Sequence, residues 1–275
     1  MGKVLAKELK NGYEVVCFLD NDKRKWGTIV DDIKVLGGSE TLKSIDFDEI
    51  VIASTMRFEE IKKQILNIGI SSEVFNESIH RKLMVEVDSR VNFLRDFAYE
   101  HKHDSVEYSV AEGGVFQGMF AAEINKNFPE RKLFLFDTFD GFDTRDVTVE
   151  TDSGFSNSEV KRYSDTSIDL VMGKMLHPDK VVIKKGYFPE TVAGLENEKF
   201  IFVNLDFDLY LPILAGLQFF YPRLAPGGVI LVHDYFTKIY HGVKEAVDEF
   251  EKQIKAKVIR MPIGDGISIA ILSNK

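Results

Sequence analysis

A glycine turn between a strand-like and a helix-like segment constrains this chain most. Residues 112–118 carry an acid followed by Gly113, Gly114 and Gly118. The preceding residues 106–111 alternate in polarity, which predicts a short strand. After the turn begins, apolar residues recur at every fourth position, which predicts a helix with one apolar face. These residues are Phe116, Phe120, Ile124 and Phe128. The pattern is typical of the first strand, turn and helix of an α/β domain.

The acid in the turn indicates which ligand the turn could favour. The run differs from the dinucleotide pattern Gly-x-Gly-x-x-Gly and lacks the Gly-Lys-Ser/Thr of a phosphate loop. A helix N-terminus attracts anions, but Glu112 places a carboxylate there. This favours a ligand with a cationic centre or an amine, and S-adenosylmethionine (SAM) carries both together with a ribose diol. A tight strand-to-helix turn without a ligand is the alternative.

Composition limits the classes of function. The chain of 275 residues is 44% hydrophobic and 29% charged, as expected for one or two globular domains. Its net charge of −9 argues against general nucleic-acid binding. No apolar run approaches the roughly 18–20 residues of a membrane span, and no signal peptide is apparent. A single cysteine excludes an internal disulfide framework. We therefore expect a cytoplasmic protein without a membrane span.

Residues 1–80 are predicted to form a separate, smaller α/β domain. Two apolar runs, 14–20 and 49–54, have the pattern of strands buried on both faces of a parallel sheet. Helices are expected at residues 2–9 and 58–66. The stretch resembles the truncated Rossmann-like domain at the front of many bacterial sugar-modifying and polysaccharide-assembly enzymes. That fold normally has a strand and glycine turn before its first helix, and here both are missing. We therefore expect a scaffolding, dimerising or substrate-presenting role, with a ligand role for Asp20 and Asp22 as the alternative.

Residues 81–275 are predicted to form the second domain, with a joining helix at 81–105 that caps the ligand pocket. The strands and helices that follow alternate, which predicts a parallel sheet. Its expected strands are 132–137, 181–184, 200–206 and 228–234, with an apolar helix from about 214 to 224. The segments 257–262 and 267–272 flank an Asp-Gly turn and predict an antiparallel hairpin. A parallel sheet closed by such a hairpin resembles the class I methyltransferase sheet.

The residues that end the strands are the candidate site, because ligands of open α/β sheets bind there. Asp137 could accept both hydroxyls of a ribose, or it could be a helix N-cap. Asp206, His233 and Asp234 are predicted to converge, with Asp208 beside them. Carboxylates and an imidazole can hold a divalent cation such as Mg²⁺, which could lower the pKa of a substrate hydroxyl. Alternatively, these residues cap helices and pair with lysines.

A long polar segment runs from Asp137 to Asp169. It contains nine acidic and three basic residues. Its length and polarity predict a mobile lid over the acceptor, with a solvated surface loop as the alternative.

Several spaced motifs of the second domain resemble the macrocin O-methyltransferase (TylF-type) family. They are residues 110–118, 133–142, 185–191, 205–210, 221–228, 233–235 and 242–250. The similarity covers nearly all of residues 85–275. The resemblance implies a SAM-dependent and Mg²⁺-dependent enzyme that methylates sugar hydroxyls, chiefly on antibiotic glycosides.

The resemblance also implies roles for individual residues. The SAM-binding residues would be Glu112, Gly113, Gly114, Gly118, Asp137, Thr138, Gly186, Tyr187, Phe188 and Asp206, with residues 186–188 bordering the adenine. Asp206, His233 and Asp234 would be the catalytic residues and the metal ligands. Asp206 would also take the proton of the acceptor hydroxyl. The family usually has an aspartate where His233 stands, and imidazole suits softer ions better than Mg²⁺.

We therefore expect a SAM-dependent O-methyltransferase that acts on a hydroxyl of a small molecule or glycan. The resemblance of the front domain favours surface-glycan or nucleotide-sugar modification over antibiotic tailoring. We also expect homo-oligomers. Two alternatives stay open: a SAM-binding scaffold without catalysis in glycan assembly, and a nucleotide-sugar-binding or NAD-linked protein that uses the front domain.

Overall fold

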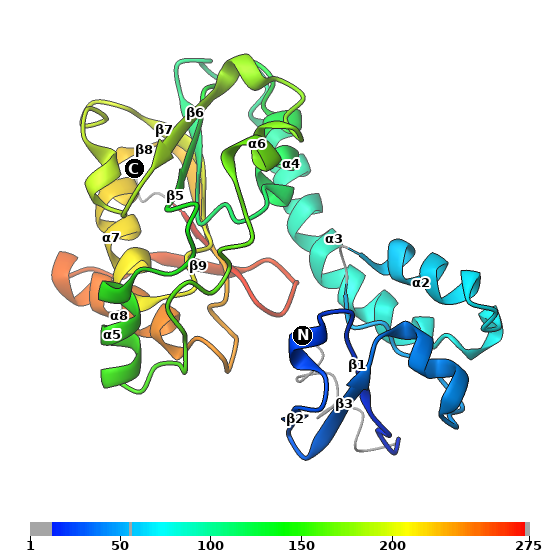
Figure 1. The fold of residues 1–275 in the computed structure, drawn as a ribbon. Coiled ribbons are helices and arrows are strands. Elements are labelled where there is room, and N and C mark those ends of the chain that lie inside the picture. The colour runs from blue at the N-terminus through cyan, green and yellow to red at the C-terminus, as the bar shows by residue number, and fades with distance from the viewer. Residues whose placement is uncertain (1–12, 55–56, 273–275) are drawn as a thin grey trace. The chain divides into compact units, whose positions relative to one another are not determined.

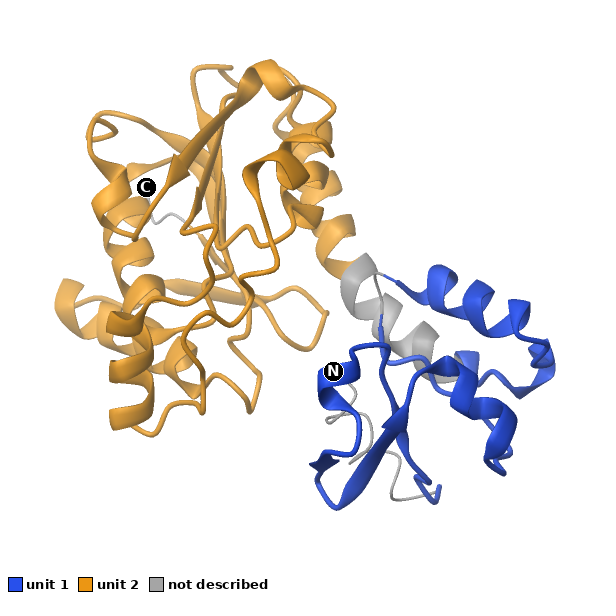
Figure 2. Ribbon diagram, viewed as in Figure 1, with its two compact units in different colours: residues 1–85 blue, residues 86–275 orange. Residues whose placement is uncertain are grey.

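A computed structural model of the chain describes residues 13–54 and 57–272, with only the backbone described for residues 78–88. The chain divides into two compact units, residues 1–85 and 86–275 (Figure 2). The helix α3 (Glu77–Glu100) runs through this division along the chain. The helix predicted at residues 2–9 lies outside the described residues. Within the described residues, no helix combines the length and apolar character needed to cross a bilayer.

The first unit contains a three-stranded sheet in the order β1-β3-β2. β1 (Phe18–Leu19) is parallel to β3 (Ile33–Gly37), and β2 (Ile29–Val30) is antiparallel to β3 (Figure 1). The helices are η1 (Lys23–Lys25), η2 (Ser39–Ser44), α2 (Phe58–Asn67) and η3 (Ser72–Val74). A small apolar core joins them, formed by Leu42, Ile52, Phe58, Ile65 and Phe75. The α2 helix confirms the helix predicted at residues 58–66.

The prediction of two doubly buried strands in this unit is wrong. Residues 14–20 contribute only the short β1, and Val16 is 56% exposed. Residues 49–54 contribute a single bridge from Ile50 to Phe75. The central strand is β3, in which buried and exposed residues alternate. Burial on both faces requires a layer of structure on each side of a sheet, whereas the described part of this unit has one apolar core.

The second unit contains a seven-stranded sheet in the order β6-β5-β4-β7-β8-β10-β9. The strands are β4 (Ser109–Gly113), β5 (Leu133–Asp137), β6 (Val181–Lys185), β7 (Phe200–Leu205), β8 (Leu224–Val232), β9 (Ile259–Pro262) and β10 (Ile269–Leu272). The first five pair in parallel, and β10 is antiparallel to both β8 and β9. This confirms the predicted fold class, a parallel α/β sheet closed by an antiparallel hairpin.

Helices cover both faces of this sheet (Figure 1). They are α4 (Met119–Asn127), α5 (Thr144–Asp152), α6 (Ile168–Met172), α7 (Tyr210–Phe220) and α8 (His241–Ile254), with the short η4 (Pro178–Lys180), η5 (Glu190–Val192) and η6 (Tyr221–Arg223). One core includes residues of α5, α7 and α8, and the other includes residues of α3, α4 and α6. Val110 and Ala111 belong to different cores because successive strand residues point to opposite faces.

Three elements differ from the sequence-based expectation. The helix after the glycine turn begins at Met119, so Phe116 lies in the loop, with a positive φ of 47°. The helix α7 begins at Tyr210, earlier than residue 214. The segment predicted as a lid contains α5 and α6, and Asp146 and Glu150 within α5 are buried. These acids have internal hydrogen-bond donors, so the segment is not a uniformly solvated loop.

Candidate active site

The candidate site lies where the strand order reverses, between β4 and β7. Both β5 and β6 lie on one side of this point, and β8 lies on the other. Ligands of open α/β sheets bind outside the carboxyl ends of the strands at such a switch point. At these ends Gly113 and Leu205 are register partners, and the N–H of Asp206 donates to Gly113 O over 2.7 Å. The glycine loop and Asp206 are therefore neighbours.

The glycine loop leaves no room for a side chain at two positions. Gly114 has a φ of 81°, and a Cβ there would collide with the backbone oxygen of Asp206. Gly118 has a φ of 78°, and its Cβ would lie 2.9 Å from the side chain of Val171. Both positions therefore require glycine for the left-handed backbone and for the close approach.

Asp137 attaches this loop to the end of β5. Its Oδ2 accepts the N–H groups of Val115 and Phe116 at 2.7 and 3.0 Å. Its Oδ1 accepts the N–H of Phe139 at 2.6 Å. The N-cap alternative is not realised, because Asp143 caps the helix that follows. One carboxylate thus fixes two turns, and Oδ1 keeps capacity for a further donor such as a hydroxyl.

Glu112 lies buried below the loop, with 2% of its surface exposed. Its Oε1 accepts a hydrogen bond of 2.8 Å from the Nδ2 of Asn204, on the neighbouring strand. Its Oε2 has no hydrogen-bond partner in the described part of the chain. Burial raises the pKa of Glu112 to about 8, although the charge of Arg90 opposes this shift. A buried polar atom without a partner costs about 1–3 kcal/mol, so a cationic ligand group at Oε2 would be stabilising.

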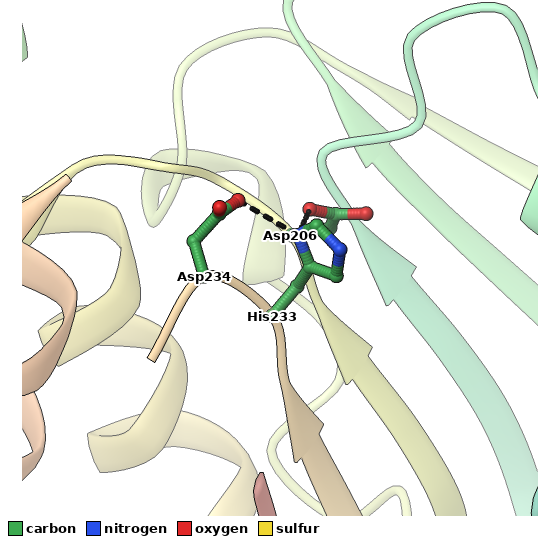
Figure 3. Close-up of side chains that lie close together, drawn as sticks. All are labelled: Asp206, His233 and Asp234. Carbon is green, nitrogen blue, oxygen red and sulfur yellow. Dashed lines mark hydrogen bonds and ion pairs between the residues drawn. The ribbon is translucent and has the colours of Figure 1, made fainter. Parts of the chain in front are cut away.

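Asp206, His233 and Asp234 meet beyond the ends of β7 and β8 (Figure 3). The Nδ1 of His233 lies 3.0 Å from Asp206 Oδ1 and 2.7 Å from Asp234 Oδ2. One potential ligand atom from each residue lies within 4.8 Å of the others. We call these three residues the acid–histidine cluster. The structure thus brings together the residues predicted to converge, and their roles stay predictions.

Charges within the acid–histidine cluster balance one another. Burial opposes a charge on the imidazole, but the two carboxylates raise the pKa of His233 to about 10. Burial also opposes ionisation of Asp206, but the charges of Arg90 and His233 hold its pKa well below the usual range. Burial, and then the charges of Asp234 and Asp206, raise the pKa of the adjacent Asp208 well above the usual range. The carboxylates on either side of His233 thus favour the protonated imidazole.

Arg90, on α3, is a site residue that the sequence did not predict. Its Nη2 donates to Asp206 Oδ2 at 2.7 Å, and the side chain is 13% exposed. The guanidinium carbon lies 4.1 Å from the centre of the Phe120 ring. Its Nε has no hydrogen-bond partner among the described residues. An arginine next to the apolar stripe of a helix predicted to cap the pocket is the signal that could have found it.

The residues predicted to border an adenine have different surroundings. Phe188 lies in the core, and its ring centre is 4.8 Å from that of Phe207. The hydroxyl of Tyr187 donates to Asp146 at 2.8 Å. Burial is the main cause that raises the pKa of Asp146 to about 6. Thr138 donates to a backbone carbonyl of its own turn. Tyr187 is half-buried and more accessible than Phe188.

Three aromatic residues contact one another in series on the side of Asp208, and we call them the aromatic wall: Phe116, Tyr163 and Tyr240. The ring centres of Phe116 and Tyr163 are 5.2 Å apart, and the two tyrosine hydroxyls are 3.3 Å apart. Burial, and next the charge of Asp208, raise the pKa of both phenols, which places them near that carboxylate. The segment predicted as a lid therefore contributes Tyr163 to the edge of the site.

The acid–histidine cluster fits a divalent cation after one change. The Nδ1 of His233 faces two carboxylate oxygens, an arrangement that favours a proton on this nitrogen, and a cation that bound there would have to displace that proton. The second oxygen of Asp206 is paired with Arg90. Two carboxylates and one imidazole are ligands for many divalent ions, and the imidazole favours softer ions over Mg²⁺. The donor set therefore suits a softer divalent ion better than Mg²⁺.

Solved structures similar to this chain share its fold. The calicheamicin methyltransferase CalS11 matches with a TM-score of 0.57 and 16% identity, covering 80% of this chain and 91% of that one. The O-methyltransferase NovP matches with a TM-score of 0.55 and 19% identity, covering 68% and 80%. These likenesses show the Rossmann-like fold of the class I methyltransferases.

Sequence comparison identifies the family. The chain is 26% identical over 188 residues to the mycinamicin III 3''-O-methyltransferase of Micromonospora griseorubida, covering 60% of this chain and 73% of that one. It is 26% identical over 141 residues to the 8-demethyl-8-(2,3-dimethoxy-alpha-L-rhamnosyl)-tetracenomycin-C 4'-O-methyltransferase of Streptomyces olivaceus, covering 48% and 52%. Residues 1–80 match a family model named C2185-like, N-terminal. Residues 82–265 match the model of macrocin-O-methyltransferase (TylF), so the chain belongs to the TylF family and is a class I methyltransferase.

Proposed function

We propose that this methyltransferase transfers a methyl group from SAM to a hydroxyl of a sugar, carried by a small molecule or a glycan. The observation that carries the proposal is the buried Glu112, whose unpartnered oxygen lies next to the glycine loop at the switch point. SAM has an ammonium group that would pair with this oxygen. The names of both curated relatives describe O-methyltransferases, which supports a hydroxyl as the acceptor.

The donor side of the site is suited to the nucleoside and amino-acid ends of SAM. Glu112 would bind the ammonium, and the loop that Gly114 and Gly118 let pack closely against Asp206 and Val171 would pass beside the ligand. Asp137 would accept a ribose hydroxyl at Oδ1, while its Oδ2 keeps the loop in place. The half-buried ring of Tyr187 would border the adenine better than the core residue Phe188.

On the acceptor side, the partly exposed rings of Phe116 and Tyr163 would contact the apolar face of a sugar, and the carboxylates of the acid–histidine cluster would face its hydroxyls. Bound SAM would supply an electrophilic methyl group. The acceptor oxygen would bond to this carbon in line with the C–S bond, which would break to leave S-adenosylhomocysteine, and the hydroxyl proton would pass to solvent. Asp206 would accept a hydrogen bond from the hydroxyl and orient it. Because neighbouring cations lower the pKa of Asp206, its carboxylate accepts a proton poorly. An orienting role therefore suits Asp206 better than the proton-accepting role predicted from the sequence.

The acid–histidine cluster would hold a divalent cation through Asp206, His233 and Asp234. A bound cation would lower the pKa of the acceptor hydroxyl. If this part of the proposal is right, EDTA removes turnover and a divalent cation restores it. Turnover that is indifferent to the chelator would remove the cation from the proposal and leave methyl transfer standing.

The setting of the reaction is proposed from the first unit. Its resemblance to domains of sugar-modifying and polysaccharide-assembly enzymes favours a surface glycan or a nucleotide-sugar as acceptor. Presentation of that acceptor, or self-association of the chain, would be the role of this unit. A panel of glycans, nucleotide-sugars and glycosylated natural products would distinguish these acceptors by turnover.

Calorimetry and turnover together test the central proposal. We expect the full chain to bind SAM and not NAD, and to methylate at least one member of the sugar panel. Asp206→Asn should remove turnover and leave the affinity for SAM nearly unchanged. Binding of NAD without any response to SAM would refute the proposal, whereas SAM binding without turnover on any acceptor would favour a scaffold. Loss of SAM binding in Asp206→Asn would show that Asp206 belongs to the donor side.

A further inference from the structure

Two side chains next to the glycine loop, the buried Glu112 and the largely buried Arg90, each have one buried polar atom without a hydrogen-bond partner among the described residues. Glu112 has Oε2 without a hydrogen-bond partner, and Arg90 has Nε without one, among the residues that the structure describes. The two side chains interact electrostatically, since the charge of Arg90 acts on Glu112 and the charge of Glu112 acts on Arg90. Arg90 is bonded to Asp206, whose N–H donates to the residue that follows Glu112, so a free acceptor and a free donor both lie at the ends of β4 and β7.

The guanidinium of Arg90 is held in place by two other contacts. Its Nη2 donates to Asp206 over 2.7 Å, and its Cζ lies over the ring of Phe120, 4.1 Å from the ring centre. A guanidinium has five N–H donors, so the bond to Asp206 leaves others for a second carboxylate. An arginine that is oriented in this way loses little side-chain entropy when it binds such a group.

We propose that Arg90 binds the carboxylate at the amino-acid end of SAM, while Glu112 binds the ammonium of the same group. This inference rests on the proposed function, because it names a further residue of the SAM site. An α-amino acid carries an ammonium and a carboxylate on a single carbon, which matches the acceptor oxygen of Glu112 and the guanidinium donor of Arg90. Arg90 would also connect the cofactor to Asp206, so that the donor and acceptor sides share one fixed guanidinium.

The structural alternative is that Arg90 only neutralises Asp206. The two roles predict different ligand preferences, because a residue that serves Asp206 alone has no contact with the cofactor carboxylate. Decarboxylated SAM tests this difference directly, since it keeps the sulfonium and the amine and lacks only the carboxylate. Calorimetry without an acceptor measures both affinities, so no turnover is needed.

The wild-type chain should prefer SAM to decarboxylated SAM by roughly 10- to 100-fold, the range of one charge-assisted hydrogen-bonded pair. Arg90→Gln should reduce this preference to within about 3-fold, and Arg90→Lys should retain part of it. The control Arg95→Gln, at an exposed arginine of the same helix, should keep the full preference. Glu112→Gln should lower the affinity for SAM and for decarboxylated SAM by the same factor, because both ligands carry the amine.

The preference is a ratio within one variant, so a change in the folded fraction cancels from it. Asp206→Asn provides a second variant if Arg90→Gln folds poorly, since it removes the partner of Arg90 and should leave the preference intact. Equal affinity of the wild-type chain for the two ligands would overturn the inference, as would a full preference in Arg90→Gln. Failure of the wild-type chain to bind any adenosyl ligand would instead refute the proposed function.

Discussion

Replacing Gly114 by alanine should destabilise the second unit more than the left-handed backbone alone requires. The residue has a φ of 81°, and a non-glycine residue in this left-handed conformation lowers the free energy of unfolding by roughly 1–2 kcal/mol. Its Cβ would also collide with the backbone oxygen of Asp206, which cannot turn away as a side chain can. An overpacked atom costs a further 1–3 kcal/mol or so. The expected total is about 2–5 kcal/mol.

Gly154→Ala is the matched control for this substitution. Gly154 also has a positive φ, 67°, but nothing lies within 4 Å of the position of its Cβ. Gly154→Ala should therefore lower the free energy of unfolding only by the cost of the left-handed backbone, roughly 1–2 kcal/mol. The difference between the two losses of unfolding free energy therefore measures the contact between Gly114 and Asp206, which follow β4 and β7.

Urea unfolding followed by far-UV circular dichroism measures both free energies on the full chain. The single tryptophan, Trp26, belongs to the first unit, so its fluorescence reports on a part of the chain that neither substitution touches. Gly114→Ala should also weaken SAM binding, because the loop must move away from Asp206. Equal destabilisation by the two substitutions would refute the argument that the loop is closed by backbone contact.

Three further predictions concern other buried charges. Burial raises the pKa of Asp146 to about 6 in the folded state, whereas an aspartate in the unfolded chain loses its proton at about pH 4. The free energy of unfolding should therefore fall as the pH rises from about 4 to 6. Asp146→Asn keeps an acceptor for Tyr187 and should flatten this dependence, with a gain of about 1–2 kcal/mol at pH 7 in urea titrations; an unchanged pH profile would contradict the shift. His233→Asp should raise the affinity for Mg²⁺ in calorimetry, because a carboxylate replaces an imidazole, and an unchanged affinity would argue against His233 as a ligand. Glu251→Ala should lower the free energy of unfolding by about 3–5 kcal/mol, because this 4% exposed carboxylate pairs with two basic side chains. Removal of Glu249, which forms a surface pair, should lower it by under about 1 kcal/mol in thermal unfolding. Similar losses in the two variants would show that burial does not strengthen the pairing of Glu251.

The two units differ in how far the sequence predicted them. In the second unit, continuous apolar runs became buried strands because helices cover both faces of the sheet. In the first unit, the same kind of run at 14–20 became a two-residue strand, because the described unit has only one small apolar core. A local pattern thus predicts a strand correctly only where the rest of the fold provides something to bury it.

The sequence by itself determined the family, the order of strands and helices in the second unit, and the acids that end its strands. These properties follow from local spacing, because a strand period, a glycine turn and a strand-end acid each occupy a few adjacent residues. Only the tertiary structure decided that Arg90 pairs with Asp206, that Asp137 fastens the glycine loop, and that Phe188 joins the core. Each of these contacts joins residues distant in the chain, and such pairings depend on how the elements pack together.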